Sequence, residues 1–225
     1  MERLVFLFML LATCHAERQD LSGKVFTFPQ QTNTFFVPLV PSENVVLHSI
    51  TVCLRFFTDI SRSQSLFSLA SQSSTNGFIL YKSQFDVYHI NVMHKTADFW
   101  GLPDKLSEWI SYCGIWESNT GLAQVWVNGK PSSRKLLQRG SSLTPPYSII
   151  LGQDQDSYGG GFDAKQSFVG HMKDVHMWDR VLSPHEIQYF AHGSTFSPGN
   201  VLSWKNLEYT TRGDVEVEDE QKIPA

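Results

Sequence analysis

Long apolar runs, basic charge and helical periodicity are all scarce in this sequence of 225 residues. No run approaches the ~20 consecutive apolar residues that a membrane-spanning helix needs, so no membrane span is predicted. The net charge is −4 and the isoelectric point about 6.0, which gives no basic surface for specific nucleic-acid binding. Apolar residues seldom recur at helical spacing, which argues against a helical bundle. The length suits one large domain or two small ones.

Motifs that identify enzymes or zinc sites are also missing. The sequence has no G-x-S-x-G nucleophile elbow and no glycine-rich phosphate loop. His171 and His176 are five residues apart in a segment predicted to be a strand, so they should point to opposite faces, unlike a pair of zinc ligands. No Asn-x-Ser/Thr sequon occurs, so N-linked glycosylation is not expected. These absences favour a binding protein over an enzyme.

Residues 1–16 are typical of a secretory signal peptide. A short polar start precedes an apolar run from Leu4 to Ala12, and Cys14 and Ala16 are the small residues that a signal peptidase reads. The alternatives are a buried strand or a membrane anchor, but the run is too short to cross a bilayer. The sequence therefore predicts cleavage after Ala16, a secreted, extracellular protein and a mature domain of residues 17–225.

Three cysteines are present, and the first of them, Cys14, lies within the predicted signal peptide. Cys53 and Cys113 remain, and an even number of cysteines in an oxidising compartment favours a disulfide bond between them. Two buried free thiols are the alternative.

Strand patterns and turn signals dominate the mature chain and predict an all-β fold, an antiparallel sandwich. One helix is expected from Pro184 to His192 on one sheet, because Ser183 and Glu186 form a capping box around Pro184 and Gly193 follows. The acidic segment 214–220 has a composition compatible with loose order. The predicted strands are 24–28, 45–57, 77–81, 86–93, 109–116, 122–127, 148–151, 170–178 and 206–210.

The segment from Leu151 to Phe168 is rich in side-chain oxygens. Calcium accepts about six to eight oxygen ligands from carboxylates, amides and backbone carbonyls, and glycines at 159–161 would let the chain turn back. The spacing is not that of an EF-hand, because Lys165 stands at the twelfth position counted from Asp154. A cation site and a solvated turn both remain open. The candidate ligands are Asp154, Gln155 through its carbonyl, Asp156, Asp163 and Gln166.

The same acidic residues and one tripeptide allow two other chemical interpretations. Asp154 and Asp156 could form the carboxylate pair of a sandwich-fold glycoside hydrolase, but their Gly-, Gln- and Ser-rich loop gives no sign of desolvation. Arg212-Gly213-Asp214 spells an integrin-type tripeptide, a motif too short to establish adhesion.

Four motifs fall in order, with nearly constant spacing, along the mature chain: DLSGKVFTFP (20–29), GQDQDSYGG (152–160), QSFVG (166–170) and MWD (177–179). On these motifs the chain resembles the pentraxins. The resemblance implies a jelly-roll sandwich of the lectin and laminin-G type with one helix on one face. It also implies a homopentamer, or two stacked pentamers, with two calcium ions per subunit on the opposite face.

The resemblance also implies roles for individual residues. Thr75 stands where these relatives carry an aspartate, and Asp154 where they carry a glutamate, which puts the number and affinity of the calcium ions in question. Ser111 and Ile115 depart from the family's pattern around the second cysteine. The implied calcium ligands are Asn76, Asp154, Gln155, Asp156, Asp163 and Gln166, the implied pocket residues are Ile79 and Tyr81, and the implied disulfide joins Cys53 and Cys113.

The expected function is that of a secreted, calcium-dependent, lectin-like pattern-recognition protein of innate immunity and the acute phase, without enzymatic activity. Its expected ligands carry phosphate or carboxylate groups, as phosphocholine, phosphoethanolamine and some glycans do, and complement components are expected partners. A laminin-G-like adhesion or matrix module without ring assembly, and the glycoside hydrolase, are the alternatives.

Overall fold

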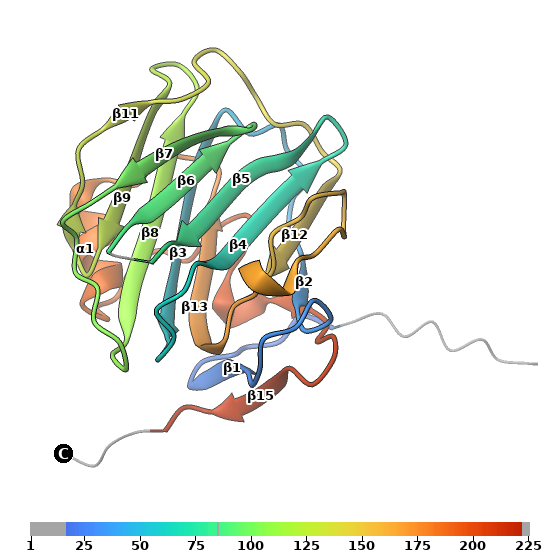
Figure 1. Ribbon diagram of the computed structural model, residues 1–225. Helices are drawn as coiled ribbons and strands as arrows, with labels where there is room; N and C mark the ends of the chain where they lie inside the picture. The colour runs from blue at the N-terminus through green and yellow to red at the C-terminus, as the bar shows by residue number, and fades with distance from the viewer. Residues whose placement is uncertain (1–16, 85, 222–225) are drawn as a thin grey trace, which may run out of the picture.

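The computed structural model describes residues 17–84 and 86–221, which form two antiparallel sheets packed face to face (Figure 1). The eight-stranded sheet has the order β10-β9-β8-β3-β13-β1-β15, with β11 also pairing with β9, and the seven-stranded sheet has the order β14-β2-β12-β4-β5-β6-β7. The first sheet comprises β10 (Lys130–Pro131), β9 (Leu122–Val127), β8 (Ile110–Glu117), β3 (Ser49–Phe57), β13 (Gly170–Trp178), β1 (Lys24–Phe28), β15 (Glu216–Asp219) and β11 (Lys135–Leu136). The second comprises β14 (Glu208–Tyr209), β2 (Val37–Val40), β12 (Tyr147–Leu151), β4 (Gln64–Ser71), β5 (Ser74–Lys82), β6 (Tyr88–Val92) and β7 (Lys95–Phe99).

Alternate residues of both sheets fill the space between them, as the pleat of each strand requires. Aromatic rings supply much of this core, and Phe26, Phe56, Phe67 and Phe78 have no exposed surface. Complete burial of such a side chain contributes about 1.5–3 kcal/mol, so the core is the main source of stability.

At Gly114 the two sheets approach each other too closely to leave room for a side chain. A Cβ atom at this position of β8 would lie 2.2 Å from Cδ2 of Leu80 and 3.2 Å from Cδ1 of Ile90, both on the facing sheet. The missing side chain therefore makes room for Leu80 in the middle of the core.

The helix α1 (Pro184–Ala191) lies on the outer face of the eight-stranded sheet, and the seven-stranded sheet faces the viewer in Figure 1. Ile187 and Phe190 pack there with Trp126 and Trp178. The same cluster contains a disulfide between Cys53 and Cys113, which are directly opposite each other on β3 and β8. The predicted disulfide is confirmed.

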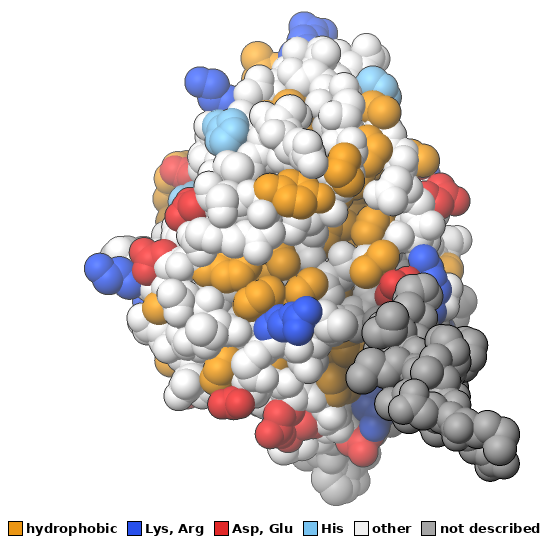
Figure 2. Space-filling view, turned by 90° about the vertical axis from the view of Figure 1, so that its right-hand side faces the viewer, with side chains coloured by type: hydrophobic (Ala, Val, Ile, Leu, Met, Phe, Trp, Pro, Cys, Tyr) orange, Lys and Arg blue, Asp and Glu red, His pale blue; other side chains and the backbone are white. Residues whose placement is uncertain are grey.

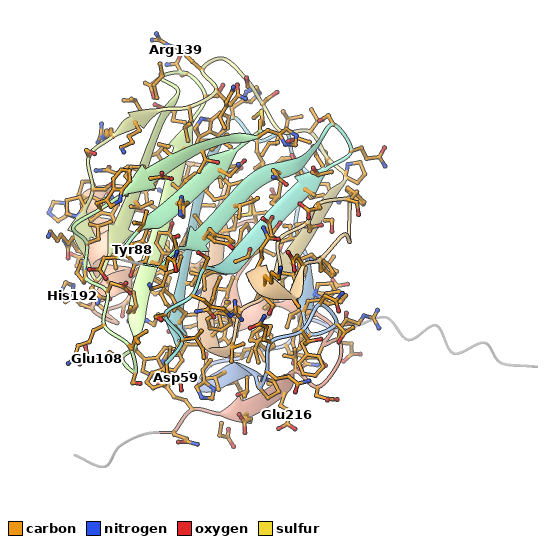
Figure 3. All side chains as sticks on the ribbon, viewed as in Figure 1. Asp59, Tyr88, Glu108, Arg139, His192 and Glu216 are labelled. Atoms are coloured by element: carbon orange, nitrogen blue, oxygen red, sulfur yellow. A yellow bond between two sulfur atoms is a disulfide. The ribbon has the colours of Figure 1, made fainter. Side chains whose placement is uncertain are left out.

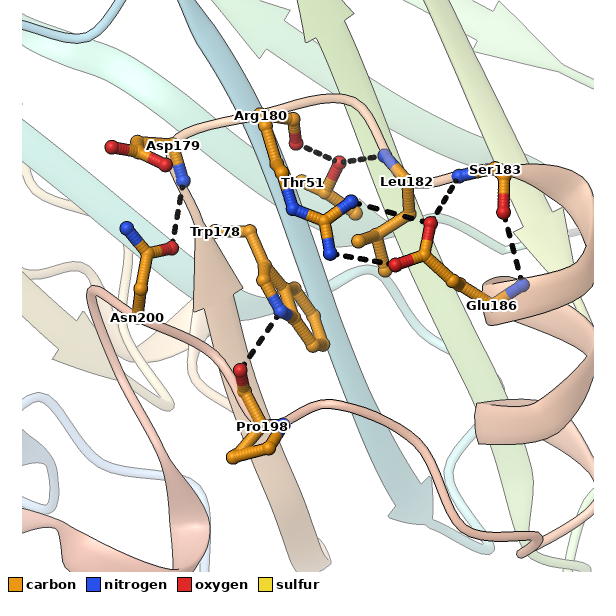
Figure 4. Close-up of polar contacts among 9 residues, drawn as sticks. All are labelled: Thr51, Trp178, Asp179, Arg180, Leu182, Ser183, Glu186, Pro198 and Asn200. Atoms are coloured by element: carbon orange, nitrogen blue, oxygen red, sulfur yellow. Dashed lines mark hydrogen bonds and ion pairs between the residues drawn. The ribbon is translucent and has the colours of Figure 1, made fainter.

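The N-terminus of α1 is fixed by a connected set of hydrogen bonds (Figure 4). Ser183 Oγ accepts from the Glu186 N–H at 3.3 Å, and the Glu186 carboxylate accepts from the Ser183 N–H at 2.8 Å. Arg180 also binds this carboxylate, and its hydrogen bond is the main cause that lowers the pKa of Glu186 to about 2. Thr51 Oγ1 donates to the Arg180 carbonyl and accepts from the Leu182 N–H, which ties the cap to β3.

The helix forms as expected from its capping box, except that it ends at Ala191, with His192 as the C-cap. The long predicted strand 45–57 begins only at Ser49, although Leu47 still forms an isolated bridge. The strands β2, β4 and β7 were not predicted. The segment 214–220 is not loose, because its residues Glu216–Asp219 pair with β1 as an edge strand.

The prediction for the two histidines of β13 is wrong. His171 lies opposite Phe57 and His176 opposite Cys53 on β3, so both occupy the outer face of the sheet. The register shifts between Lys173 and His176, and Asp174 has a φ of 53°, which adds one residue and reverses the expected alternation. A β-bulge is invisible in the spacing of the sequence.

Three further sequence features have defined places. Residues 1–16, the predicted signal peptide, lie outside the described residues. Within 17–84 and 86–221, no helix is long and apolar enough to cross a membrane. Arg212-Gly213-Asp214 forms an exposed turn, with Gly213 at a φ of 64° and Arg212 bridged to Phe36.

Gly114→Ala is expected to lower the free energy of unfolding by about 1–3 kcal/mol, because the new methyl group overpacks the core against Leu80. Urea unfolding measures the change. Gly160→Ala is the control, since its Cβ would meet only an ordinary contact at 3.4 Å. Equal stability of the two variants would contradict close packing at Gly114.

Candidate functional site

The loop that joins β12 to β13 lies over the outer face of the seven-stranded sheet, on the side away from α1. Its short 3₁₀ helix η1 (Ala164–Gln166) lies in front of β4 (Figure 1). The chain reverses at Ser157 and Gly160, which exchange two backbone hydrogen bonds, and Gly159 and Gly161 take φ values of 76° and 75°. The glycine run therefore turns the chain back as predicted.

Gln155 fastens this loop to the sheet. Its side chain is fully buried, and Nε2 donates to the carbonyls of Ser68 and Ser148 at 3.0 and 3.1 Å. Its Oε1 accepts from the Gly159 N–H at 2.9 Å. Because the side-chain amide is hydrogen-bonded inside the protein, only the backbone carbonyl of Gln155 could bind a ligand, and this role stays a prediction.

Three of the predicted ligands hold buried oxygens that have no hydrogen-bond partner among the described residues. These atoms are Oδ1 of Asn76, Oδ1 of Asp154 and Oε1 of Gln166. A contact of 3.5 Å between Gln166 Nε2 and Asp154 Oδ2 links two of the side chains. Buried polar atoms are nearly always satisfied, and oxygens of this kind are the ligands that calcium prefers. The donor set thus fits a hard cation.

The carboxylate of Asp154 lies in an unfavourable environment. Asp154 is only 8% exposed, and burial is the main cause that raises the pKa of its carboxyl group to about 6. The negative charge of Asp156 raises the pKa further. The desolvation that the sequence did not indicate is therefore present, and a bound cation would stabilise the ionised form.

The other two acidic candidates, Asp156 and Asp163, are exposed. Asp163 caps η1, because its Oδ1 accepts from the Lys165 N–H at 2.9 Å. Within the described ranges, no three Asp, Glu, His or Cys side chains gather closely enough to hold a metal ion by themselves. Any metal site here must therefore include amide and carbonyl oxygens.

Asn76 lies near the start of β5, directly after the hairpin that joins β4 and β5. Thr75, its neighbour, is partly exposed and supplies a hydroxyl group where a carboxylate would add negative charge. A hydrogen bond links Asp154 and Gln166 of the loop before β13, whereas Asn76 lies on β5, about eighty residues earlier in the sequence. Its place in the ligand set stays a prediction.

The predicted pocket residues Ile79 and Tyr81 lie on the outer face of β5, since Phe78 and Leu80 face the core. Ile79 is only 3% exposed, so little of its surface is accessible. Burial is the main cause that raises the pKa of Tyr81 to about 12, and the charge of Asp154 is the next cause. This coupling indicates that the Tyr81 phenol lies close to the loop.

Sequence reasoning did not identify the residues that support the site. Ser68 anchors Gln155, and Arg62 donates to the Lys165 carbonyl at 3.2 Å, next to η1. Gln153 donates to the carbonyls of Thr32 and Phe35, which holds the start of the loop. Serine, arginine and glutamine are common surface residues, so nothing in their spacing could have identified them.

The described chain is thus a two-sheet β-sandwich with a helix on one outer face and with buried carboxylate and amide oxygens that lack partners among the described residues. The chain matches the model of the Pentaxin family over residues 24–219. It belongs to the pentraxin family.

Relatives of known identity agree with this assignment. The chain is 43% identical over 194 residues to the serum amyloid P-component of Mesocricetus auratus, covering 86% of this chain and 82% of that protein. It is also 43% identical over 219 residues to the C-reactive protein of Sus scrofa, covering 96% and 97%. The native heptameric SAP-like pentraxin from Limulus polyphemus has a TM-score of 0.80 at 24% identity, covering 88% of this chain and 95% of that one, which shows the fold.

Family membership confirms the resemblance seen in the motifs and the jelly-roll sandwich. It also confirms that the protein is not an enzyme, because the pentraxin relatives are recognition proteins, and it supports pattern recognition in innate immunity as the general role. The raised pKa of Asp154 therefore does not indicate a glycoside hydrolase.

Asp154→Asn is expected to raise the free energy of unfolding of the calcium-free protein by about 1–3 kcal/mol near neutral pH, because it removes a buried ionised carboxylate. The pKa rises from 3.8 in the unfolded chain to about 6 in the folded one. The wild-type protein should therefore recover this stability as the pH falls through 6 towards 4, and the difference should close. Urea unfolding in EDTA at several pH values measures it.

Asp156→Asn is the matched control, because Asp156 is exposed. It should give a smaller gain, since it relieves only the repulsion between the two carboxylates. A gain as large as that of Asp154→Asn would mean that repulsion, and not burial, dominates.

Proposed function

We propose that this protein is a secreted, calcium-dependent pattern-recognition protein whose ligands carry phosphate or carboxylate groups. The observation that carries the proposal is the set of three buried oxygens without partners, on Asn76, Asp154 and Gln166. Each belongs to a residue that the family resemblance implies as a calcium ligand. The full proposed ligand set is Asn76, Asp154, Gln155 through its carbonyl, Asp156, Asp163 and Gln166.

Charge balance explains why such a site would select anionic ligands. Asp154, Asp156 and Asp163 supply three negative charges, and bound calcium would supply two positive charges per ion. With two ions a positive excess remains, which a phosphate or carboxylate group can neutralise. Tyr81 and Ile79 then lie beside the bound group. Phosphocholine, phosphoethanolamine and anionic glycans all carry suitable groups.

We further propose that several copies assemble into a ring through opposite edges of the eight-stranded sheet. At the β15 edge an open cavity of about 780 Å³ has aromatic walls, Phe57 and Trp109, and an acidic rim. Glu108, Asp219 and Glu220 of the rim pair with Lys105, Lys24 and Lys173, whereas Glu218 forms no ion pair with a Lys or Arg among the described residues. The aromatic walls and Glu218 therefore suit an apolar segment that carries a basic residue.

The opposite edge of the same sheet carries such a segment, residues 130–139. Leu136 is 67% exposed there, and Lys130, Arg134 and Arg139 are exposed around it. Figure 3 places Arg139 and Glu216 at opposite ends of the molecule. The flank with β2 and β12 instead shows scattered charges of both signs among hydrophobic side chains (Figure 2). Contact between two different edges is heterologous, and it gives a ring when the rotation from one subunit to the next closes.

Five subunits are the number that the family resemblance implies, although the related Limulus protein is heptameric. Weak binding at each site would then be multiplied by avidity on repetitive surfaces. Complement components remain expected partners on the strength of the family alone, and cleavage after Ala16 remains a prediction.

Calorimetry tests the calcium proposal. Calcium should bind the wild-type protein, and phosphocholine or phosphoethanolamine should then release heat only in calcium. Thr75→Asp should raise the calcium affinity, because it adds a carboxylate beside Asn76, and Asp154→Asn should lower it. Absence of ligand heat at millimolar calcium would contradict the proposal.

Light scattering tests the ring. Leu136→Glu should reduce the mass from that of a ring towards that of one subunit, because it places a negative charge against the acidic cavity. Val40→Glu is the control, since Val40 is 44% exposed on β2, a strand of the other sheet. A subunit-sized mass of the wild-type protein in calcium would favour the laminin-G-like alternative, and an intact ring in Leu136→Glu would exclude this interface.

A further inference from the structure

A small cavity lies on the outer face of the eight-stranded sheet, on the side away from the loop between β12 and β13. Its volume is about 100 Å³. Two cross-strand pairs of β8 and β9, Ile115–Gln124 and Glu117–Leu122, form one side of it. Residues directly opposite in an antiparallel pair share a face, and here that face also carries Trp126. Leu182 and the capped start of α1, drawn in Figure 4, form the other side.

Apolar side chains make up most of the cavity wall. An engineered apolar cavity of about 150 Å³ can hold benzene, so a volume of this size suits a branched group of about four carbons. A long acyl chain would not fit. The apolar wall residues are Ile115, Leu122, Trp126, Leu182, Pro184 and Ile187.

The indole N–H of Trp126 lacks an acceptor. Trp126 lines the cavity and is only 8% exposed, and its buried Nε1 has no hydrogen-bond partner among the described residues. The indole N–H groups of Trp116 and Trp178, in contrast, donate to backbone carbonyls at 2.8 and 3.1 Å. Because buried donors are nearly always satisfied, an acceptor atom is expected beside Trp126 when the cavity is filled.

Two side chains of opposite charge, Arg134 and Glu117, border the cavity. Neither forms an ion pair within the part of the chain that the structure describes. Arg134 Nε donates to Gln124 Oε1 at 3.4 Å, which holds the guanidinium group over β9. The Glu117 carboxylate accepts from the Thr120 hydroxyl at 2.8 Å. A ligand with a single charge would be attracted by one of the two groups and repelled by the other, whereas a zwitterion matches both.

We propose that this cavity binds a free apolar amino acid of about the size of leucine. Its carboxylate accepts hydrogen bonds from Arg134 and from Trp126 Nε1, its ammonium group donates to Glu117, and its branched side chain fills the apolar part. A residue within a peptide lacks both charges, and a residue at a peptide end lacks one of them. The site therefore favours the free amino acid over a protein partner, and it requires neither calcium nor the ring.

Calorimetry of the full-length protein in EDTA tests the proposal with three ligands. These are L-leucine, 4-methylpentanoate, which lacks the ammonium group, and 3-methylbutylamine, which lacks the carboxylate. Leucine should bind about 10-fold or more tightly than either analogue, because each analogue loses charge-assisted hydrogen bonds. Calcium should leave the leucine affinity unchanged. An analogue that binds as tightly as leucine, or no binding of leucine at millimolar concentration, would overturn the proposal.

Substitutions at the rim separate the two charges. Arg134→Gln and Glu117→Gln should each weaken leucine binding about 10-fold. For 4-methylpentanoate, Arg134→Gln should weaken binding, whereas Glu117→Gln should strengthen it because the repulsion is removed. Arg139→Gln is the control, since it removes the same charge from the same segment but Arg139 does not line the cavity. An equal loss of leucine binding in Arg139→Gln would overturn the proposal.

The indole N–H resonances in NMR spectra give a separate readout. The Trp126 resonance, assigned from its absence in Trp126→Phe, should move downfield with leucine because the N–H gains an acceptor. Trp204 is the internal control, because its buried Nε1 also lacks a partner among the described residues, but Trp204 does not line this cavity. A Trp126 resonance that stays in place while leucine binds would overturn the proposal.

Discussion

The ligand-facing side of this protein depends on one buried amide. The Gln155 side chain joins β4, β12 and the turn at Gly159 through four hydrogen bonds. Its anchoring holds Asp154 beneath the loop and leaves Asp156 exposed on the other side. A glutamine can do this because its amide donates and accepts at once, whereas a carboxylate cannot donate. Gln155 therefore helps to position the loop that carries Asp154, although its own side-chain oxygen is bound to the Gly159 N–H.

The same arrangement places function in conflict with stability. Asp154 is buried against Asp156, and Asn76 and Gln166 hold oxygens without partners among the described residues. These features disfavour the folded state when the site is empty, and the tightly packed core of the sandwich compensates for them.

The sequence was most informative where one local rule decides the structure. The capping box at Ser183, the pairing of two cysteines and the glycine run at 159–161 were all predicted correctly. It was least informative where tertiary packing decides. The serine-rich strand β4 is buried along its whole length, and the acidic strand β15 is held by pairing with β1. The bulge at Asp174 places His171 and His176 on the same face of the sheet, where the spacing predicted opposite faces. Asn76 is far from residues 154–166 in sequence, and only the family resemblance indicated it as a ligand.

Ring closure through opposite sheet edges has a consequence for orientation. Subunits related by rotation about one axis all present the same outer face in the same direction. Every loop between β12 and β13 would then lie on one side of the disc and every α1 helix on the other. A particle coated by such discs would display only the helices to its surroundings, whatever ligand holds them. The assembly would thus convert many different chemical surfaces into a single uniform one.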